Sequence, residues 1–235
     1  MPERTGLAAQ APGVLVRKVH DHSMPGVDVA VTAFPERDPQ RGGVQKILDD
    51  AISAKLCVTA DASGGARVEV TLRSEKVGHS FPSGAAQDRR AWVELEGTRR
   101  GVVAFTSGRI PEGKAVASSA DSQILLLRDY HFDADDRATG RFWLTKRVKS
   151  DLLPVAASLR SPDAERSVVH VYSFPGAMPD SVKMRVKIRP LDFDLLEDLV
   201  ASGDLAPELA ASVHTFDLAS TQLAWLPGTD CVATR

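Results

Sequence analysis

Residues 66–74 read ARVEVTLRS, and this stretch sets the fold class of the chain. Val68, Val70 and Leu72 alternate with charged and polar residues, which is the period of a β-strand with one buried face. Residues 183–189, KMRVKIR, repeat the alternation with lysine and arginine on the outer face. Such strands belong to antiparallel sheets, because antiparallel sheets commonly leave one face in water.

Further apolar runs lie between these two stretches. They are AWVELEG (91–97), GVVAFTSG (101–108), SQILLLRDYHF (122–132), GRFWLTKRV (140–148) and RSVVHVYSF (166–174), with turns rich in Gly, Pro, Asp and Ser between them. Seven or eight such strands predict a mainly β protein, an immunoglobulin-like antiparallel β-sandwich. The residues expected to point into its core are Val68, Val70, Leu72, Val93, Leu95, Val169, Val171, Val186 and Ile188.

Two segments have the helical period instead. GVQKILDDAISAKL (43–56) and LDFDLLEDLVASG (191–203) place apolar residues three and four apart, and Gly203 stands where it would end the second helix. We expect two peripheral helices there. The first forty residues hold five prolines, which predicts an extended N-terminal arm over 1–42 and a β-sandwich domain over 43–235.

Composition and charge disfavour several classes of partner. The 29 Lys and Arg balance 31 Asp and Glu along the chain, so we expect no basic face and no nucleic acid. The longest apolar runs, such as ILLL (124–127), are far shorter than the roughly 20 residues that span a bilayer. The opening MPERTGLAAQAPGVL lacks the basic start and apolar core of a signal peptide. We therefore expect no membrane span and no signal peptide in this chain.

The two cysteines, Cys57 and Cys231, lie far apart, and the sequence contains neither a CxxC pair nor a CxxCH haem-attachment site. Such sparse cysteine is no mark of an oxidising compartment, so we expect two free thiols in preference to a disulfide. The chain itself should bind no haem covalently.

The stretch VGHSFPSG (77–84) raises the question of function. It begins like the G-x-S-x-G nucleophile elbow, but Pro82 replaces the second glycine and a strand follows, so Ser80 is a poor nucleophile. The same residues suit a turn that Pro82 and Gly84 fix, in which His79 is either structural or a ligand for metal or haem. In both cases we expect a buried Phe81 and a main-chain or carboxylate acceptor at one nitrogen of His79.

A second candidate lies in KVHDHSMPG (18–26). On an extended segment His20 and His22 would point the same way, and such a pair can bind a transition metal or supply one imidazole to haem iron. A metal site would need further ligands that the pair does not provide. We expect His131 and His170, which lie inside strand patterns, to be structural.

The stretch VGHSFPSGAAQDRRAWVELEG, followed by VVAFTSG, DYHFDADDRATGRFWLTKRV and VKMRVKIRP, resembles the β-rich C-terminal portion of bacterial multihaem c-type cytochromes. The resemblance covers most of residues 14–205, and its most specific piece is the GHxFP[TS]G turn with RRAW behind it. In that family CxxCH haem sites precede this region, the last often reading CxxCHMP. The opening MPERTG therefore suggests that residues 1 and 2 are the tail of such a site.

The resemblance implies a non-catalytic module that acts as scaffold and docking domain of a multihaem electron-transfer protein in the periplasm or outside the cell. His22 and His79 would be distal ligands of haem c held in an upstream region or in a partner. Arg89 and Arg90 would contact haem propionates, because a guanidinium fork suits a carboxylate. Ion pairing within the chain is the alternative role of these arginines.

Two other interpretations remain open from the residues. In the first interpretation, the chain is a free-standing β-sandwich that binds a protein or a carbohydrate without a cofactor. In the second it would be a hydrolase that uses Ser80 or an enzyme with a histidine-bound metal. We expect no catalytic activity, and the sequence does not specify the redox partner, the haem number or the oligomeric state.

Overall fold

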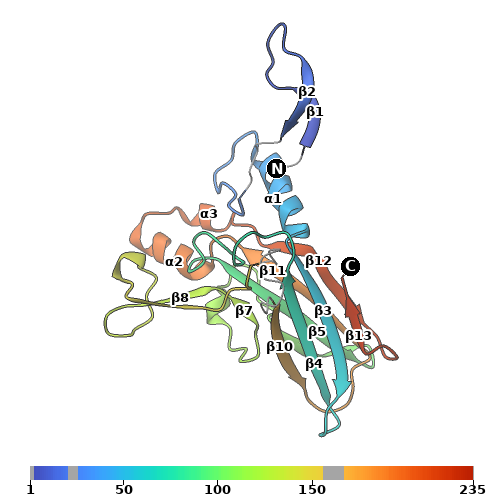
Figure 1. Cartoon of the computed structure of the whole chain (residues 1–235). Helices are drawn as coiled ribbons and strands as arrows, with labels where there is room; N and C mark the ends of the chain where they lie inside the picture. The colour runs from blue at the N-terminus through green and yellow to red at the C-terminus, as the bar shows by residue number, and fades with distance from the viewer. Residues whose placement is uncertain (1–2, 21–25, 156–166, 235) are drawn as a thin grey trace.

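The computed structural model describes residues 3–20, 26–155 and 167–234, and its structure is mainly β (Figure 1). One antiparallel sheet has the strand order β10-β4-β3-β13, and a second has the order β12-β11-β5-β6, with β7 pairing β5. The strands of the first sheet are β3 (Ile52–Ala60), β4 (Ala66–Ser74), β10 (Ser167–Phe174) and β13 (Cys231–Ala233). Those of the second are β5 (Arg90–Arg99), β6 (Val102–Ser107), β7 (Leu126–Leu127), β11 (Ser181–Arg189) and β12 (Phe216–Trp225).

A single cluster of buried apolar side chains draws on both sheets. Leu56 and Val70 come from the first sheet, and Val93 and Val186 come from the second. Burying a valine or leucine side chain fully contributes roughly 1.5–3 kcal/mol, so this shared cluster is the main source of stability.

The other elements lie around these sheets. Figure 1 shows a hairpin of β1 (Glu3–Leu7) and β2 (Val16–His20) that projects from the body beyond α1 (Arg37–Asp49). On the left-hand side, α2 (Phe193–Ser202) and α3 (Pro207–Ala210) lie above a separate pair of strands, β8 (Asp129–Phe132) and β9 (Arg147–Ser150). Two short 3₁₀ turns complete the described elements, η1 (Val116–Ser118) and η2 (Phe142–Leu144).

The first helix differs from its prediction, whereas the second agrees with it. α1 spans Arg37–Asp49 instead of 43–56, because Ile52 already begins β3. Ile52 and Leu56 fit a helical face, but they also fit alternation, and both are inner-face residues of the strand. α2 ends at Gly203, whose φ of 83° is the left-handed conformation expected of a C-terminal glycine.

Seven of the nine residues expected in the core are buried, and the two in β10 are not. Val169 is 53% exposed and Val171 is half-buried, whereas Tyr172 and Phe174 are fully buried. Both faces of SVVHVYSF carry apolar residues, so alternation alone did not fix which face turns inward. The inward face of β10 is the one that carries Phe174. Its ring packs against β5 at Gly97, in the space that a Cβ of that residue would occupy.

The strand pattern at 140–148 was also wrong, since Phe142–Leu144 form a 3₁₀ turn and β9 begins only at Arg147. Two strands, β12 and β13, were not predicted from the sequence. In β12 the alternation of Phe216 and Leu218 is interrupted by a bulge, since Val186 of β11 lies opposite Leu218 and the next partner along β12 is Leu223.

Cys57 and Cys231 form a disulfide, so the prediction of free thiols was wrong. The two residues are 174 positions apart, but β13 pairs with β3 and places them directly opposite each other, with their Cα atoms 4.0 Å apart. Because β13 was not predicted, sequence reasoning had no basis for this proximity. No helix within the described residues is long and apolar enough to cross a membrane.

We predict that replacing both cysteines by serine (C57S/C231S) lowers the free energy of unfolding by about 2–5 kcal/mol, because the crosslink restricts the unfolded chain. Urea denaturation checks this, alongside a thiol count in denaturant. Protein from an oxidising compartment should release two thiols only after reduction. Two thiols reactive without reduction would contradict the disulfide.

The phase of β10 predicts unequal effects of two substitutions in the same strand. Phe174→Ala should lower the free energy of unfolding by about 3–5 kcal/mol, because it leaves a cavity in the core. Val169→Ala should change it by less than about 0.5 kcal/mol, because that side chain faces water. A larger loss for Val169→Ala than for Phe174→Ala in chemical denaturation would show that the strand has the opposite phase.

Candidate functional site

The turn VGHSFPSG lies between β4 and β5 and is anchored by its phenylalanine. The Phe81 N–H donates to the Leu153 carbonyl at 2.9 Å, and the Leu153 N–H donates back to the Phe81 carbonyl at 2.8 Å. The Phe81 side chain is buried in the core cluster, as predicted, and the Phe81–Pro82 peptide bond is cis. The rest of the turn is therefore held against the body while His79 and Ser80 remain exposed.

Among the described residues, the imidazole of His79 bonds only within its own turn. Its Nδ1 lies 3.0 Å from the Ser80 carbonyl oxygen, which provides the main-chain acceptor expected at one ring nitrogen. A carbonyl only accepts, so Nδ1 donates and Nε2 keeps its lone pair in the neutral ring. The Ser83 hydroxyl lies 3.3 Å from Nε2, which is long for a hydroxyl donor. Nε2 is thus an electron-pair donor on an exposed residue, with one weak partner in the described part of the chain.

A cavity of about 250 Å³ lies beside this turn. Its apolar wall combines residues from three segments, namely Val27, Ile47, Leu48, Ala51, Phe81 and Pro82. The polar side chains that line it are those of Lys76, His79, Ser83 and Arg89. An apolar cavity with a few convergent polar groups is the usual form of a cofactor or ligand site.

Arg89 connects the turn to the segment that follows the projecting hairpin. Its guanidinium donates to the Ser83 carbonyl and to the Asp28 carboxylate, the latter at 2.5 Å. The side chain is buried, and its Nε has no hydrogen-bond partner within the described residues. Gly84 is required here, because its φ is +77° and a Cβ would meet the Arg89 guanidinium.

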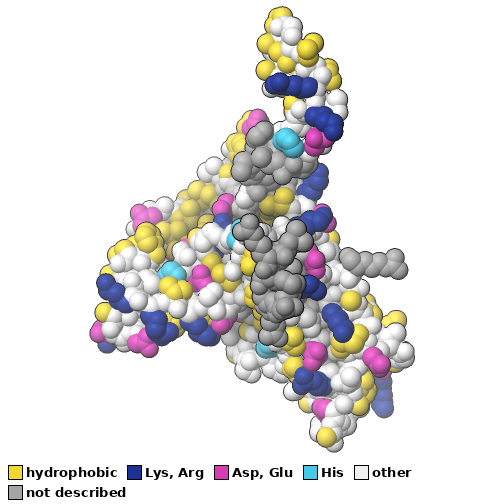
Figure 2. Space-filling model, in the orientation of Figure 1, with side chains coloured by type: hydrophobic (Ala, Val, Ile, Leu, Met, Phe, Trp, Pro, Cys, Tyr) yellow, Lys and Arg dark blue, Asp and Glu magenta, His cyan; other side chains and the backbone are white. Residues whose placement is uncertain are grey.

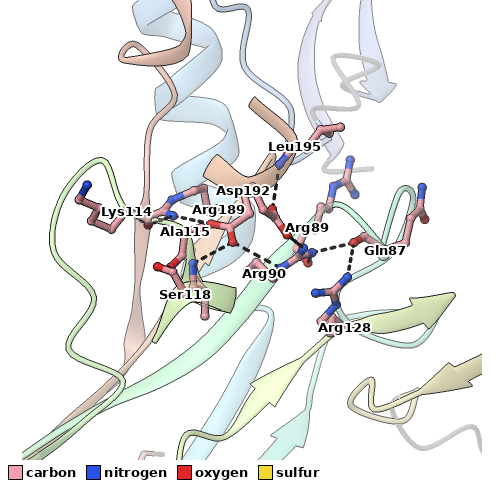
Figure 3. Close-up of polar contacts among 12 residues, drawn as sticks. Gln87, Arg89, Arg90, Lys114, Ala115, Ser118, Arg128, Arg189, Asp192 and Leu195 are labelled. Atoms are coloured by element: carbon pink, nitrogen blue, oxygen red, sulfur yellow. Dashed lines mark hydrogen bonds and ion pairs between the residues drawn. The ribbon is translucent and has the colours of Figure 1, made fainter. Parts of the chain in front are cut away.

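Arg90 belongs to a buried network behind the turn (Figure 3). The side chain is only 2% exposed, and its NH1 donates to the Gln87 carbonyl at 2.7 Å and to the Arg89 carbonyl at 2.9 Å. Its guanidinium also pairs with Asp194 at 2.7 Å and lies 3.5 Å from Asp192. These contacts join the start of β5 to the start of α2.

Asp192 is the centre of this network and is 0% exposed. Its carboxylate accepts from Arg189 at 2.5 Å and from the Val116 N–H at 2.9 Å. Although Asp192 is the N-cap residue of α2, its side chain makes no capping hydrogen bond to the helix. Its own N–H donates to the Asp88 carbonyl at 3.1 Å. The network therefore joins β5, β11, η1 and the start of α2.

Burial shifts the ionisation of groups in and around the network. It lowers the pKa of Arg189, and the neighbouring Asp192 carboxylate opposes that shift. Burial raises the pKa of Asp88, with the charge of Arg90 acting in the opposite direction. Arg128, which donates to the Gln87 carbonyl at 2.9 Å, also has its pKa lowered by burial and by the charge of Arg90. The pKa of each of these groups thus depends on the charges of its neighbours as well as on burial.

The other predicted site residues that the structure describes do not line the cavity. His22 lies outside the described residues, and His20 is at the end of β2, opposite Glu3. His131 and His170 bond within the fold, to Thr145 at 3.0 Å and to the Gln123 carbonyl at 2.7 Å. Within residues 3–20, 26–155 and 167–234, no group of three or more His, Cys, Asp or Glu is arranged to hold a metal ion.

The Ser80 hydroxyl makes no hydrogen bond to a base within the described part of the chain, and the main-chain oxygen of the same residue holds the nearest imidazole. The arrangement resembles neither a nucleophile with its base nor a metal centre. What the turn offers chemically is one imidazole lone pair beside an apolar cavity and a guanidinium at the cavity wall.

Sequence reasoning missed the acidic half of the network. Asp192 and Asp194 open a helix, where acidic residues are common because they favour the positive end of the helix dipole. The available signal was the apolar context of the Arg-Arg pair before AWV, which makes a buried partner for Arg90 necessary. Nothing in the sequence placed residues 192 and 194 beside residue 90.

We predict that Asp192→Asn lowers the free energy of unfolding by about 3–5 kcal/mol, because it leaves buried guanidinium charge without its carboxylate. Asp198→Asn is the matched control, since Asp198 lies in the same helix and is exposed. It should change stability by less than about 0.5 kcal/mol. Equal effects of the two substitutions in denaturant titrations would contradict the buried network.

No protein-family model matches the chain, and no curated protein matches it by sequence. Among solved structures, it is similar to the crystal structure of a penta-haem cytochrome c552 from Thermochromatium tepidum, with a TM-score of 0.57 and 17% sequence identity. The match covers 77% of this chain and 41% of the cytochrome chain, so this chain spans less than half the length of that protein. At this identity the likeness is one of fold, and it relates the chain to a region of a multihaem cytochrome c.

Proposed function

We propose that this chain is a non-catalytic module of a multihaem c-type electron-transfer protein, with an immunoglobulin-like β-sandwich as its scaffold. In this proposal the module docks against haem-bearing domains and presents His79 as a distal ligand to a haem held outside this chain. The likeness in fold to part of a penta-haem cytochrome supports the proposal.

The observation that carries the proposal is the state of His79. A distal haem ligand needs a neutral imidazole that is oriented by a bond at one nitrogen and keeps its lone pair at the other. The Ser80 carbonyl supplies that bond at 3.0 Å, and Nε2 of this exposed residue has only the Ser83 hydroxyl, at 3.3 Å, as a partner among the residues that the structure describes. The adjacent cavity of about 250 Å³ offers an apolar wall suited to a porphyrin edge.

The residues of this chain fit a haem that is attached elsewhere. Both cysteines are joined in the disulfide, so neither is available for a thioether bond to haem c. His79 would be the axial ligand, and Arg89, which lines the cavity, would face a propionate. Haem c bound there would supply one-electron transfer.

Two candidates from the resemblance stay predictions. His22 lies outside the described residues, so its role as an alternative distal ligand has no geometry behind it. Arg90 is buried and bonded within the protein, and it does not line the cavity, so its geometry offers no support for contact with a propionate. We propose that Arg90 acts by holding the turn in place.

The disulfide is consistent with an oxidising location outside the cytoplasm. We propose the periplasm or the cell exterior, where c-type cytochromes and structural disulfides occur together. The projecting hairpin supports docking, because an isolated two-stranded hairpin is marginally stable in water and gains stability when a neighbouring domain covers it.

The proposal is tested by adding a haem c peptide that carries one axial histidine to the purified chain. The open iron position should take Nε2 of His79, which shifts the Soret band from its high-spin to its low-spin position. His79→Ala should weaken this binding at least about tenfold. The controls are His20→Ala and His22→Ala, which should bind as the unchanged chain does.

Three results of this titration would contradict the proposal in different ways. No spectral shift with the unchanged chain would remove the haem-ligand function and favour a cofactor-free binding module. Loss of the shift in His22→Ala alone would move the ligand to His22. A shift that survives in all three variants would show that none of the three histidines is the haem ligand.

A further inference from the structure

The loop between β8 and β9 exposes an aromatic pair that no other part of the described chain covers. Phe142 is 65% exposed and Trp143 is 66% exposed, and the two rings pack edge to face with centroids 5.1 Å apart. Leu144, which completes the 3₁₀ turn, is exposed as well. Large aromatic side chains clustered on a projecting loop are the usual anchors of a protein interface. We call residues 141–146 the aromatic tip.

The charges around the aromatic tip divide into paired and unpaired groups. Arg147 and Lys149 of β9 are held by Asp136 at 2.6 Å and by Asp151 at 2.7 Å. Arg141 and Lys146, one at each end of the tip, make no ion pair within the described residues. Figure 2 shows basic and acidic side chains interspersed over the hairpin at the left-hand end of the molecule. The tip thus has an apolar centre with two free positive charges.

A second feature of the same side of the molecule complements the tip. A cavity of about 640 Å³ lies between α2, α3 and the outer face of the sheet that contains β5 and β11. Its apolar wall includes Trp92, Ile110, Phe193, Ala210 and Val213. No residue of the aromatic tip lines it, so within one chain it receives no aromatic anchor from the loop.

The charges at this cavity are opposite in sign to those of the tip. The basic residues in its wall are already engaged, because Lys187 pairs with Glu94 at 3.5 Å and Arg189 pairs with Asp192 at 2.5 Å. Glu112 and Glu197 also line the cavity, and neither makes an ion pair within the described residues. The free charge at the cavity is therefore negative.

We propose that two copies of this chain form a two-fold dimer in which the aromatic tip of each enters the α2–α3 cavity of the other. Trp143 and Phe142 would fill the apolar wall, and Arg141 and Lys146 would meet the carboxylates of Glu112 and Glu197. The tip follows β8 and the cavity is lined by α2 and α3, and Figure 1 draws these elements on the same side of the molecule, so one symmetry axis can form both contacts at once. The proposal does not rest on the haem-binding function.

A second copy fits the tip better than a membrane does. Residues 129–151 contain five Asp and five Lys or Arg, so the hairpin has no net charge. Attraction to anionic lipid grows by about 1 kcal/mol for each basic residue near the surface, and a neutral hairpin gains little from it. The α2–α3 cavity offers both an apolar wall and free carboxylates.

Sedimentation velocity of the purified chain over a concentration series tests the dimer. We expect a dimer fraction that rises with concentration, and Trp143→Ser should weaken association about 30-fold or more, as removal of an aromatic anchor does. Leu226→Ser is the matched control, because Leu226 is also apolar and 59% exposed but lies in neither surface. Circular dichroism and thermal melts verify that each variant is folded.

Charge reversal tests the pairing itself. Lys146→Glu and Glu197→Lys should each weaken the dimer, and the two changes combined in one chain should restore it. A monomer at every concentration, a dimer indifferent to Trp143→Ser, or a double variant without recovery would overturn the proposal. So would a monomer that binds vesicles of phosphatidylcholine and phosphatidylglycerol and loses this binding in Trp143→Ser, because the tip would then serve a membrane.

Discussion

The buried carboxylate of Asp192, bonded to Arg189 and close to Arg90, is the contact on which the candidate site depends. It joins β5, β11 and the start of α2, and its main chain is bonded to Asp88 in the segment that leads from the GHSFPSG turn into β5. Burying these charges costs free energy that only the complete set of partners offsets. Because the loss of any partner would leave a buried charge unpaired, the network keeps one geometry. We infer that this geometry holds Arg89, whose carbonyl accepts from Arg90, and with it the turn, in one position.

The same arrangement separates two neighbouring arginines by role. Arg89 turns toward the cavity and reaches Asp28, whereas Arg90 turns into the protein and reaches α2. His79 is thus presented by a turn that is fixed from behind, and its ring is oriented by the Ser80 carbonyl. A rigid support of this kind suits a residue that must meet a group on another domain without rearrangement.

The sequence specified the mainly β class, the second helix and most of the core, because alternation and the glycine cap are local signals. It did not specify the end of the first helix, since Ile52 and Leu56 fit both periods. It left the phase of β10, the bulged β12 and the Cys57–Cys231 pair undetermined, because each depends on a partner strand far along the chain. At the candidate site, the sequence indicated the turn and both arginines, but their acidic partners lie far along the chain, 61 residues from Arg89 for Asp28 and 104 residues from Arg90 for Asp194.

The central claim is that the turn holds His79 with its proton on Nδ1 and its lone pair on Nε2. Heteronuclear NMR of the imidazole ¹⁵N nuclei at neutral pH measures this tautomer directly. The account predicts a protonated Nδ1, an unprotonated Nε2, and selective perturbation of the His79 signals when a haem c peptide is added. A proton on Nε2, with His79 signals that the haem peptide leaves unchanged, would contradict it.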